Sequence, residues 1–576
     1  MLKYRWSVAG SQPAPVATLA KELGISPLLA QCLLNRGITE SGLALRFLQP
    51  RLKDLADPFL IPNMPQAIDR LFRARSASES LVIFGDYDVD GVTSTALLVE
   101  VMRKLGWTVH FYLPSRMEEG YGLSQDGIEN CLKKFPVSLV LAVDCGSTAV
   151  STVDWLRQQG VDVLILDHHQ VSTPAPCATA LLNPQLGPSA TGAFRELCSA
   201  GLAFKLAHAL VKRGREMGLS EALQIDLREF LDLVALGTIA DLVPLNGENR
   251  ILVSAGLARL TSTQRPGLVA LKNVAQVTGA VGVYEVGFQL GPRLNAAGRL
   301  ENALRALDLL LAATVAEAEP IAHELDAQNR ERQKIERSIV DEVLGTLRSR
   351  FNPEADFVIV EGRLLWHIGV VGIVASRVLR EFYRPTVIVG GEGDEWRGSG
   401  RSIEGFDLAA ALRSCGDVLI RHGGHALAAG LTIRANQVET LRARLNELAR
   451  QTLKPELLQP VLRLDAAVRL SDLTVELVKE LQRLKPFGQG NASVQLLACG
   501  IVSEKPPQRV GKEQQHLKLW VSDGDGEKSH EALWWNCASQ SPPAGRFDLA
   551  FVPEISEFNG RQSVQLKVLD LRSCMD

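Results

Sequence analysis

A chain of 576 residues is too long for one hydrophobic core, so we expect two to four domains. Its composition, 46% hydrophobic and 22% charged, is that of a globular protein and excludes a largely disordered chain. The formal net charge of −3 excludes a surface that is basic throughout. A nucleic-acid site would therefore have to be a local group of Arg and Lys.

The N-terminal residues show no basic start followed by an apolar run of signal-peptide length. No stretch of about 18 uninterrupted apolar residues occurs in the chain. We therefore expect a cytoplasmic protein without a membrane partner. The nine cysteines include no CxxC pair, which argues against a zinc ribbon and fits a reducing compartment.

Short apolar, β-rich runs alternate with helical patterns between about residues 81 and 245. The predicted strands lie within residues 81–84, 107–114, 137–144, 161–167 and 180–184. This alternation predicts a parallel sheet with crossover helices, in which ligand sites lie beyond the carboxyl ends of the strands.

Residues 315–349 carry apolar positions at helical spacing beside a dense charged face, which predicts a long connecting helix. A second α/β pattern follows, and strand-like segments with turn signals from about residue 460 predict a small β-barrel or sandwich. We expect five parts: an N-terminal helical extension at 1–64, a parallel-sheet domain at 65–314, the connecting helix at 315–349, a smaller α/β domain at 350–455 and a C-terminal β domain at 460–576.

Acidic residues and histidines follow several of the predicted strands. In GDYDVDG, the aspartates are spaced by two residues and can aim carboxylates at one centre, while Gly91 permits a tight turn into a helix. Further candidates come later in the chain. Together they are Asp86, Asp88, Asp90, Asp144, Asp167, His168, His169 and Asp241. Crowded carboxylates cost stability unless a cation holds them, so this pattern predicts a metal site.

Each of these residues has an ordinary structural interpretation when it is taken alone. An aspartate after a strand most often caps the next helix, and a histidine pair lies at a surface more often than on a metal. The order DxDxD, D, DHH, D is much more specific than any one member, and it resembles the four motifs of the DHH superfamily of phosphoesterases.

The resemblance implies a pair of divalent ions. Their ligands or immediate neighbours would be Asp86, Asp88, Asp90, Asp144, His168 and Asp241, and His169 would either bind metal or act on the scissile phosphate. We take Asp144, His168 and His169 as the catalytic candidates. Oxygen and imidazole donors without thiolates favour Mn²⁺ or Mg²⁺.

Five further segments resemble RecJ-type exonucleases of this superfamily, at 114–123, 291–300, 367–377, 398–408 and 422–431. Their arginines can donate paired hydrogen bonds to phosphate, and we expect these arginines in glycine-rich loops, although a single Arg is ordinarily a solvated surface charge. The resemblance implies that Arg293, Asn295, Arg299, Ser399 and Arg401 hold a 5′ terminal phosphate. It also implies that Arg116 and Tyr121 guide the strand and that His425 meets the substrate, although His425 could simply cap a helix.

The resemblance implies a DHH domain, a long helix, a DHHA1 domain and an OB-type barrel, in that order. In the barrel, Trp520, Trp534, Trp535 and Phe558 either stack on bases or fill the core. The implied activity is 5′-to-3′ hydrolysis of single-stranded DNA to mononucleotides in DNA repair and recombination. The implied partners are a single-strand-binding protein and a helicase. The alternatives are a phosphodiesterase for short oligoribonucleotides or dinucleotides and a noncatalytic binding scaffold.

Overall fold

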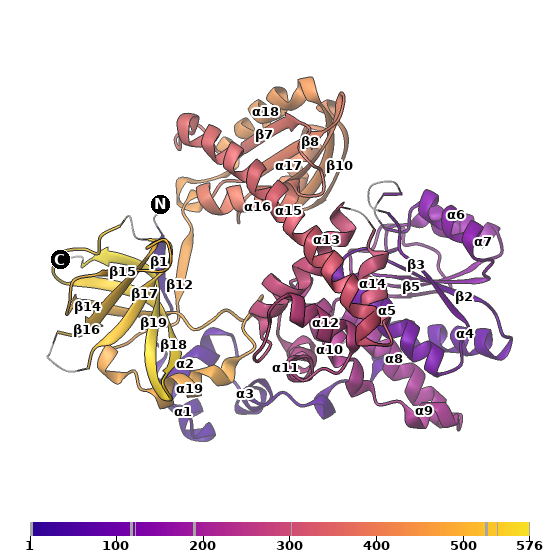
Figure 1. Cartoon of the computed structure of the whole chain (residues 1–576), viewed down its shortest axis with the longest axis horizontal. Coiled ribbons are helices and arrows are strands. Elements are labelled where there is room, and N and C mark those ends of the chain that lie inside the picture. The colour runs from indigo at the N-terminus through magenta and orange to yellow at the C-terminus, as the bar shows by residue number, and fades with distance from the viewer. Residues whose placement is uncertain are drawn as a thin grey trace.

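The computed structural model describes residues 4–115, 119–120, 122–187, 192–300, 302–524, 528–537 and 540–574. It contains a large α/β domain, a smaller α/β domain joined to it by the long helix α15, and a β-barrel beside both (Figure 1). The predicted fold class is therefore confirmed. Among the described helices, none is long and apolar enough to cross a membrane.

The large domain is built on five parallel strands in the order β3, β2, β4, β5, β6. They span Val109–Tyr112, Leu81–Gly85, Leu139–Val143, Asp162–Leu166 and Ala180–Leu182. Alternate residues of β2 enter two different cores. Leu81 and Ile83 pack with α4 (Met64–Ser76), α5 (Val89–Lys104) and α8 (Ser199–Glu216). Val82 and Phe84 pack with α6 (Gln125–Lys134) and α7 (Val150–Gln158), so both faces of the sheet are covered.

Helices follow the sheet and complete this domain. They are α9 (Ser220–Gln224), α10 (Leu231–Ala240), α11 (Gly247–Thr261), α12 (Pro266–Val274), a π-helix (Glu285–Leu290), α13 (Gly291–Leu300) and α14 (Leu304–Leu311). The connecting helix α15 spans Val315–Arg350 and begins with the Thr314 hydroxyl accepting a hydrogen bond from Glu317 N. Its N-terminal half packs on the large domain, and its C-terminal half packs in the smaller one.

The smaller α/β domain has a five-stranded sheet in the order β10, β11, β9, β8, β7. These strands span Leu419–His425, Ala428–Arg434, Glu395–Arg401, Thr386–Gly391 and Ile359–Leu364. Only β7 and β8 pair in parallel, and the other pairs are antiparallel. The helices are α16 (Val371–Phe382), α17 (Leu408–Ser414) and α18 (Val438–Thr452).

The C-terminal sheet closes on itself, because β14 (Leu496–Ser503) pairs with both β18 (Phe547–Phe558) and β16 (His516–Ser522). The circuit continues from β18 through β19 (Arg561–Ser573) and β17 (His530–Trp534) to β16. Five strands closed in this way form the OB-type barrel. The short strands β13 (Ala466–Ala467) and β15 (Gln508–Val510) extend the sheet, and α19 (Val475–Leu481) packs on it.

The N-terminal segment associates with this barrel. Strand β1 (Arg5–Val8) pairs in parallel with β12 (Val461–Leu464). Helices α1 (Pro13–Leu23), α2 (Pro27–Asn35) and α3 (Ser41–Leu48) share one hydrophobic core with the barrel. In Figure 1, α1 and α2 lie against the yellow barrel, far from α4 and α5 of the large domain. The prediction of a helical extension at residues 1–64 was therefore incomplete, because this segment also contains strand β1.

Candidate metal centre and phosphate pocket

The first acidic motif forms a tight turn between β2 and α5. Asp88 is the N-cap of α5, and its Oδ1 accepts hydrogen bonds from Asp90 N at 2.9 Å and Gly91 N at 3.1 Å. A Cβ on residue 91 would lie 2.6 Å from the carbonyl oxygen of Asp86, so only glycine fits there. The turn therefore brings Asp86, Asp88 and Asp90 into one small volume.

The first turn of α8 holds two of the aspartates. Asp90 is buried and accepts hydrogen bonds from the backbone N–H groups of Ser199 and Ala200, each at 2.8 Å. The Ser199 hydroxyl donates to Oδ1 of Asp144 at 2.8 Å. Unpaired N–H groups at a helix N-terminus favour a carboxylate, which explains how Asp90 is accommodated inside the protein. Sequence reasoning missed Ser199, although a serine that opens an apolar helical run is a usable signal.

Asp144 and Asp167 lie at the ends of the neighbouring strands β4 and β5. Asp144 is buried and has a φ of 63°, a left-handed backbone conformation that aspartate and asparagine tolerate better than most residues. Asp167 accepts hydrogen bonds from Ser147 N at 3.0 Å and from the His169 ring at 2.7 Å. Asp167 therefore orients His169.

His168 lies among three aspartates. Its Nε2 is 3.5 Å from Oδ2 of Asp241, 3.6 Å from Oδ1 of Asp144 and 3.9 Å from Oδ2 of Asp90. Neither His168 Nε2 nor Asp241 Oδ2 has a hydrogen-bond partner among the residues that the structure describes. Three overlapping groups offer donor atoms within 4.8 Å of one another: Asp144, His168 and His169; Asp90, His168 and Asp241; and Asp86, Asp88 and Asp144.

The pKa values show how strongly this cluster needs positive charge. Burial, and then the neighbouring aspartates, raise the pKa of Asp144 well above its usual range, that of Asp241 to about 9 and that of Asp90 to about 6. Burial lowers the pKa of His168 to about 4, so its ring is neutral and able to ligate. Burial opposes protonation of His169 too, but the hydrogen bond to Asp167 raises its pKa to about 9.

These residues fit a divalent metal centre. The donors are carboxylate oxygens and a neutral imidazole, which suit Mn²⁺ or Mg²⁺. Within the described part of the chain, His168 Nε2 and Asp241 Oδ2 are buried without a hydrogen-bond partner, and a cation would satisfy both. The structure therefore brings together all six residues expected to be ligands or their neighbours, with His169 at the edge of the group.

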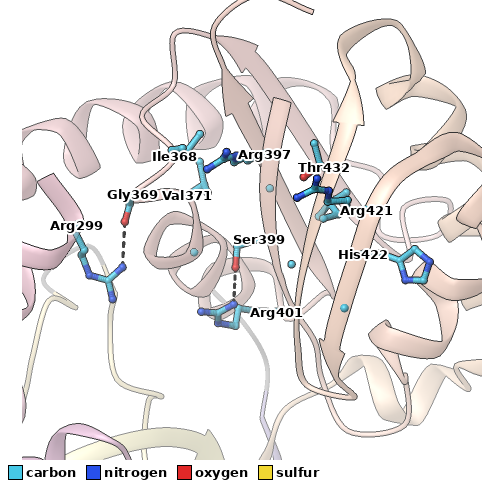
Figure 2. A pocket seen from close by; sticks show the side chains of 15 residues that line it. Arg299, Ile368, Gly369, Val371, Arg397, Ser399, Arg401, Arg421, His422 and Thr432 are labelled. Carbon is cyan, nitrogen blue, oxygen red and sulfur yellow. Dashed lines mark hydrogen bonds between the residues drawn. The ribbon is translucent and has the colours of Figure 1, made fainter. Parts of the chain in front are cut away.

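An arginine-lined cavity of about 500 Å³ lies between the two α/β domains. Its walls include Arg299 from α13, Arg397 and Arg401 from β9, and Arg421 from β10 (Figure 2). Ser399 lies between the two β9 arginines, and its hydroxyl accepts a hydrogen bond from Arg401 at 2.8 Å. Guanidinium groups gathered in a hollow are suited to bind a phosphate group.

Alternation along β9 explains this wall. Arg397, Ser399 and Arg401 are two residues apart, so they share one face of the strand. The register places Arg421 of β10 opposite Thr432 of β11, which in turn pairs with Arg397. Sequence reasoning missed Arg397 and Arg421. The period-two spacing of Arg397 with Ser399 and Arg401 was the available signal for Arg397.

Placing these arginines in glycine-rich loops was wrong. Arg293 and Arg299 lie on helix α13, while Arg401 lies on strand β9. The glycines serve packing instead. A Cβ on residue 398 would lie 2.4 Å from a methyl of Val389, and one on residue 400 would lie 2.5 Å from a methyl of Leu408.

Two of the α13 candidates contact protein groups. Arg293 forms an ion pair with Asp326 of α15 at 2.9 Å, and it does not line the cavity. The side-chain oxygen of Asn295 accepts a hydrogen bond from Val89 N at 3.1 Å, so Asn295 holds the turn that carries Asp88 and Asp90. The structure thus separates both from the arginine-lined cavity.

Helix α13 joins the cavity to the metal centre. A Cβ on Gly298 would lie 2.8 Å from the carbonyl oxygen of Tyr87, within the first acidic motif. The next residue, Arg299, lines the cavity and donates a hydrogen bond to Gly369 O at 3.1 Å (Figure 2). The two sites are therefore adjacent along one helix.

The remaining candidates for substrate contact lie in the smaller α/β domain, in the barrel or outside the described residues. His425 is exposed at the end of β10, on the sheet face that carries Arg421, and it caps no helix. Arg116 and Tyr121 lie outside the described residues. In the barrel, Trp534 is buried, whereas Trp535 and Phe558 are exposed and Trp520 is half-buried between Lys505 and Lys518.

Comparison with known proteins identifies the same three domains in the same order. The fold and the acidic cluster define a metal-dependent phosphoesterase of the DHH type. The model of the DHH family, N-terminal domain, matches residues 80–238, that of the DHHA1 domain matches 355–451, and that of the RecJ OB domain matches 464–570. The chain belongs to the RecJ family of single-stranded-DNA-specific exonucleases.

Relatives over nearly the whole chain support this membership. The chain is 37% identical to the single-stranded-DNA-specific exonuclease RecJ of Bacillus subtilis over 574 residues, which cover 99% of this chain and 71% of the relative. It is 33% identical to the Escherichia coli protein, covering 94% and 95% of the two chains. The crystal structure of RecJ from Thermus thermophilus in complex with Mn²⁺ superposes with a TM-score of 0.84 at 31% identity, covering all of this chain and 80% of that one.

Proposed function

We propose that this chain removes mononucleotides from the 5′ end of single-stranded DNA. It is a metal-dependent single-stranded-DNA exonuclease, as its family membership establishes. The direction and the product are our proposal. Their support is the arginine-lined cavity beside the acidic cluster, because a pocket that binds a terminal phosphate selects chain ends over internal positions.

The cofactor is Mn²⁺ or Mg²⁺, since the donor set fits these ions and Thermus RecJ structures contain each of them. We propose two ions, held by Asp86, Asp88, Asp90, Asp144, His168 and Asp241. When bound, such a pair activates a water molecule and stabilises the charge that develops on the phosphodiester. His169, oriented by Asp167, then donates a hydrogen bond to an oxygen of the scissile phosphate.

The observation that carries the proposal is the contact between Gly298 and Tyr87. It fixes Arg299 of the cavity next to the turn that bears Asp86, Asp88 and Asp90. A terminal phosphate bound by Arg299, Ser399 and Arg401 would therefore hold the adjoining phosphodiester close to the metal centre. Arg397 and Arg421 line the same cavity, so we add them to the phosphate-binding group.

We further propose that the chain works in the cytoplasm, in DNA repair and recombination. A single-strand-binding protein and a helicase would supply its substrate, because a single-strand exonuclease needs duplex DNA to be opened and kept open. A phosphodiesterase for short oligoribonucleotides or dinucleotides is less well supported. A substrate that short would leave the barrel without a role in substrate binding.

The test compares 5′-phosphorylated and 5′-hydroxyl single-stranded DNA, duplex DNA and a dinucleotide, each with Mn²⁺ or EDTA. We expect cleavage of the single strand with Mn²⁺, a preference for the 5′-phosphate, and release of mononucleotides. Arg401→Ala and Arg421→Ala should each reduce that preference about tenfold, which is the loss of one charge-assisted contact of about 1.5 kcal/mol. Arg413→Ala, on the exposed side of α17, is the control. An unchanged preference in both cavity variants would place the terminal-phosphate site elsewhere.

A further inference from the structure

A second pocket, of about 400 Å³, lies where the N-terminal helices meet the catalytic domain. Its walls come mainly from residues 36–56, from residues 246–251 at the start of α11, and from Gly490 in the segment that leads into the barrel. It shares no residue with the arginine-lined cavity. In Figure 1, α3 and α11 lie near the bottom of the view, whereas α16 and β10, which line that cavity, lie higher. We call this second hollow the α3–α11 pocket.

Apolar side chains form much of the wall of the α3–α11 pocket. They include Ile38, Leu43, Phe47, Pro50 and Ile251. Leu43 is 48% exposed, so this wall is in contact with solvent. The volume and the lining are those of a pocket for a small molecule with an apolar body, such as one aromatic ring or a branched alkyl group.

Arg250 of α11 adds one buried positive charge to this pocket. The residue lines the pocket and is only 2% exposed. Its Nε donates a hydrogen bond to Phe47 O at 2.7 Å, and its Nη2 donates one to Lys485 O at 2.6 Å. Its Nη1 is buried and has no hydrogen-bond partner among the residues that the structure describes. Burial, and then the charge of Arg36, lower the pKa of Arg250 to about 10, so the guanidinium stays charged at neutral pH.

The guanidinium of Arg250 has no counter-ion within the described part of the chain. The nearby buried cation Lys205 shows the contrast, because its Nζ lies 2.6 Å from Oε2 of Glu248. A buried charge without a partner is costly, and a carboxylate placed beside it would offset that cost. The pocket therefore lacks one negative charge, at a site that otherwise favours apolar groups.

We propose that the α3–α11 pocket binds a small organic acid with a single carboxylate on a compact apolar group. The carboxylate pairs with the guanidinium of Arg250, and the apolar group packs on Ile38 and Leu43. A phosphate is a poorer match, because it carries more charge and Arg250 has only one nitrogen without a partner. The bound acid bridges the N-terminal helices and the catalytic domain, so it joins the two parts. This site goes beyond the proposed function, since it needs neither DNA nor metal.

The test uses isothermal titration calorimetry on the full-length protein, in EDTA and without DNA. The probes are phenylacetate, its uncharged analogue phenylacetamide, and acetate, which has the carboxylate but no apolar body. Phenylacetate should bind, and phenylacetamide should bind at least about tenfold more weakly, because a charge-assisted contact to Arg250 is lost. Acetate should also bind at least about tenfold more weakly, because no apolar surface is buried. Phenylacetate should raise the thermal unfolding temperature, since it binds the folded protein.

A substitution on the wall separates this pocket from other sites. Leu43→Asp places a carboxylate in the first turn of α3, where a negative charge favours the helix, so the fold should be retained. The new charge repels the probe, and the affinity for phenylacetate should fall at least about tenfold. Leu45→Asp is the matched control, because Leu45 is 46% exposed on the same helix and does not line the pocket. It should bind phenylacetate like the wild type.

Arg250→Met removes the charge itself and should abolish the difference between phenylacetate and phenylacetamide. If this variant does not fold, Leu43→Asp decides the question alone. The proposal is overturned if the wild type does not bind phenylacetate, or if it binds phenylacetate and phenylacetamide equally. Unchanged binding by Leu43→Asp, or an equal loss in Leu45→Asp, would also overturn it. Cleavage of single-stranded DNA by the same preparation tests the proposed function independently of these results.

Discussion

At the scale of single residues, the metal centre concentrates buried carboxylates that repel one another. Asp90 and Asp144 are both about 1% exposed. Burial, and then the negative charge of neighbouring aspartates, raises the pKa of both carboxyl groups. Asp144 adds a left-handed backbone conformation. Unfavourable charge and unfavourable backbone geometry at one residue are typical of functional sites.

The substitution Asp144→Asn tests the role of Asp144 as a metal ligand separately from its role in the fold. Asparagine tolerates the left-handed backbone and can still accept the hydrogen bond from Ser199, so the fold should be retained. Mn²⁺-dependent cleavage should fall by more than about 100-fold, because replacing even a neighbour of a metal ligand typically lowers metal affinity or activity by about 10–100-fold. In EDTA, the thermal unfolding temperature should equal or exceed that of the wild type, since the amide avoids the cost of burying a carboxyl whose pKa is raised well above its usual range.

The control for this variant is Asp226→Asn, which removes a surface carboxylate paired with Arg228 and should leave activity and Mn²⁺ stabilisation unchanged. The measurements are turnover and the unfolding temperature with and without Mn²⁺. A folded Asp144→Asn protein that keeps near-normal turnover, or is still stabilised by Mn²⁺ like the wild type, would contradict the assignment of Asp144 as a ligand.

Most of the residues that sequence could identify lie in a motif at a strand end, whereas Asp241 follows helix α10. Asp86, Asp144 and His168 follow this rule, because parallel strands present their carboxyl ends at one edge. Ser199 and Asn295 could not be assigned in this way. Their partners lie far away in sequence: Ser199 is 55 positions from Asp144, and Asn295 is 206 positions from Val89. Only the tertiary fold brings these groups together.

At the scale of elements, α13 links end recognition to chemistry. Asn295 and Gly298 contact the turn of the acidic motif, and Arg299 lines the cavity one residue later. Sequence indicated the segment, because its arginines and glycines resemble the family pattern, but it gave the wrong element type. Glycine is unfavourable in helices, so GPRLNAAGRL favours a loop until the close approach to Tyr87 is known.

Gly298→Ala tests this link. The new Cβ would lie 2.8 Å from the carbonyl oxygen of Tyr87, a backbone atom that cannot move aside easily. We expect a destabilisation of about 1–3 kcal/mol, together with a higher Mn²⁺ requirement and a weaker 5′-phosphate preference. Both functional effects follow from moving one helix, so they should appear together.

Gly345→Ala is the matched control within α15, because a Cβ there would have nothing within 4 Å. It should leave both activities unchanged and stabilise the protein by about 0.5–1 kcal/mol, since alanine favours helix more than glycine does. Chemical denaturation measures stability, and cleavage of phosphorylated and hydroxyl-ended strands measures function. If Gly298→Ala alters only one of the two functions, α13 does not couple them.

At the scale of the whole molecule, the two ends of the chain form one unit. Leu29 and Leu33 of α2 share a core with Leu470 and Leu473 beside the barrel. The buried Arg250 of the catalytic domain donates to the carbonyl oxygens of Phe47 and Lys485, so it contacts both parts of this unit. Sequence could predict the barrel and the helices separately. Their association depends on this shared core and on strand pairing between β1 and β12, which no local pattern reveals.

This association determines which truncation can separate chemistry from strand binding. Removing residues 460–576 alone would strip α1–α3 of their core and expose apolar surface, so we expect that protein to aggregate. Removing residues 1–50 as well takes away the whole unit, and Leu52 and Leu55 still pack on the catalytic core. The fragment 51–459 should therefore fold, with Arg250 newly solvated.

Fragment 51–459 should cleave a very short 5′-phosphorylated oligonucleotide nearly as fast as the full chain does, because the metal centre and the arginine-lined cavity are intact. Its affinity for a long strand should fall by about tenfold or more, since two or three base or phosphate contacts to the barrel are lost. The salt dependence of that affinity should also be shallower, in proportion to the phosphate contacts removed. The measurement is Kd as a function of salt concentration for the fragment and for the full chain, in EDTA. It uses one strand that is too short to reach the barrel and one that is long enough. Equal affinities and equal slopes on the long strand would show that the barrel unit does not hold DNA, and would leave contact with other proteins as its role.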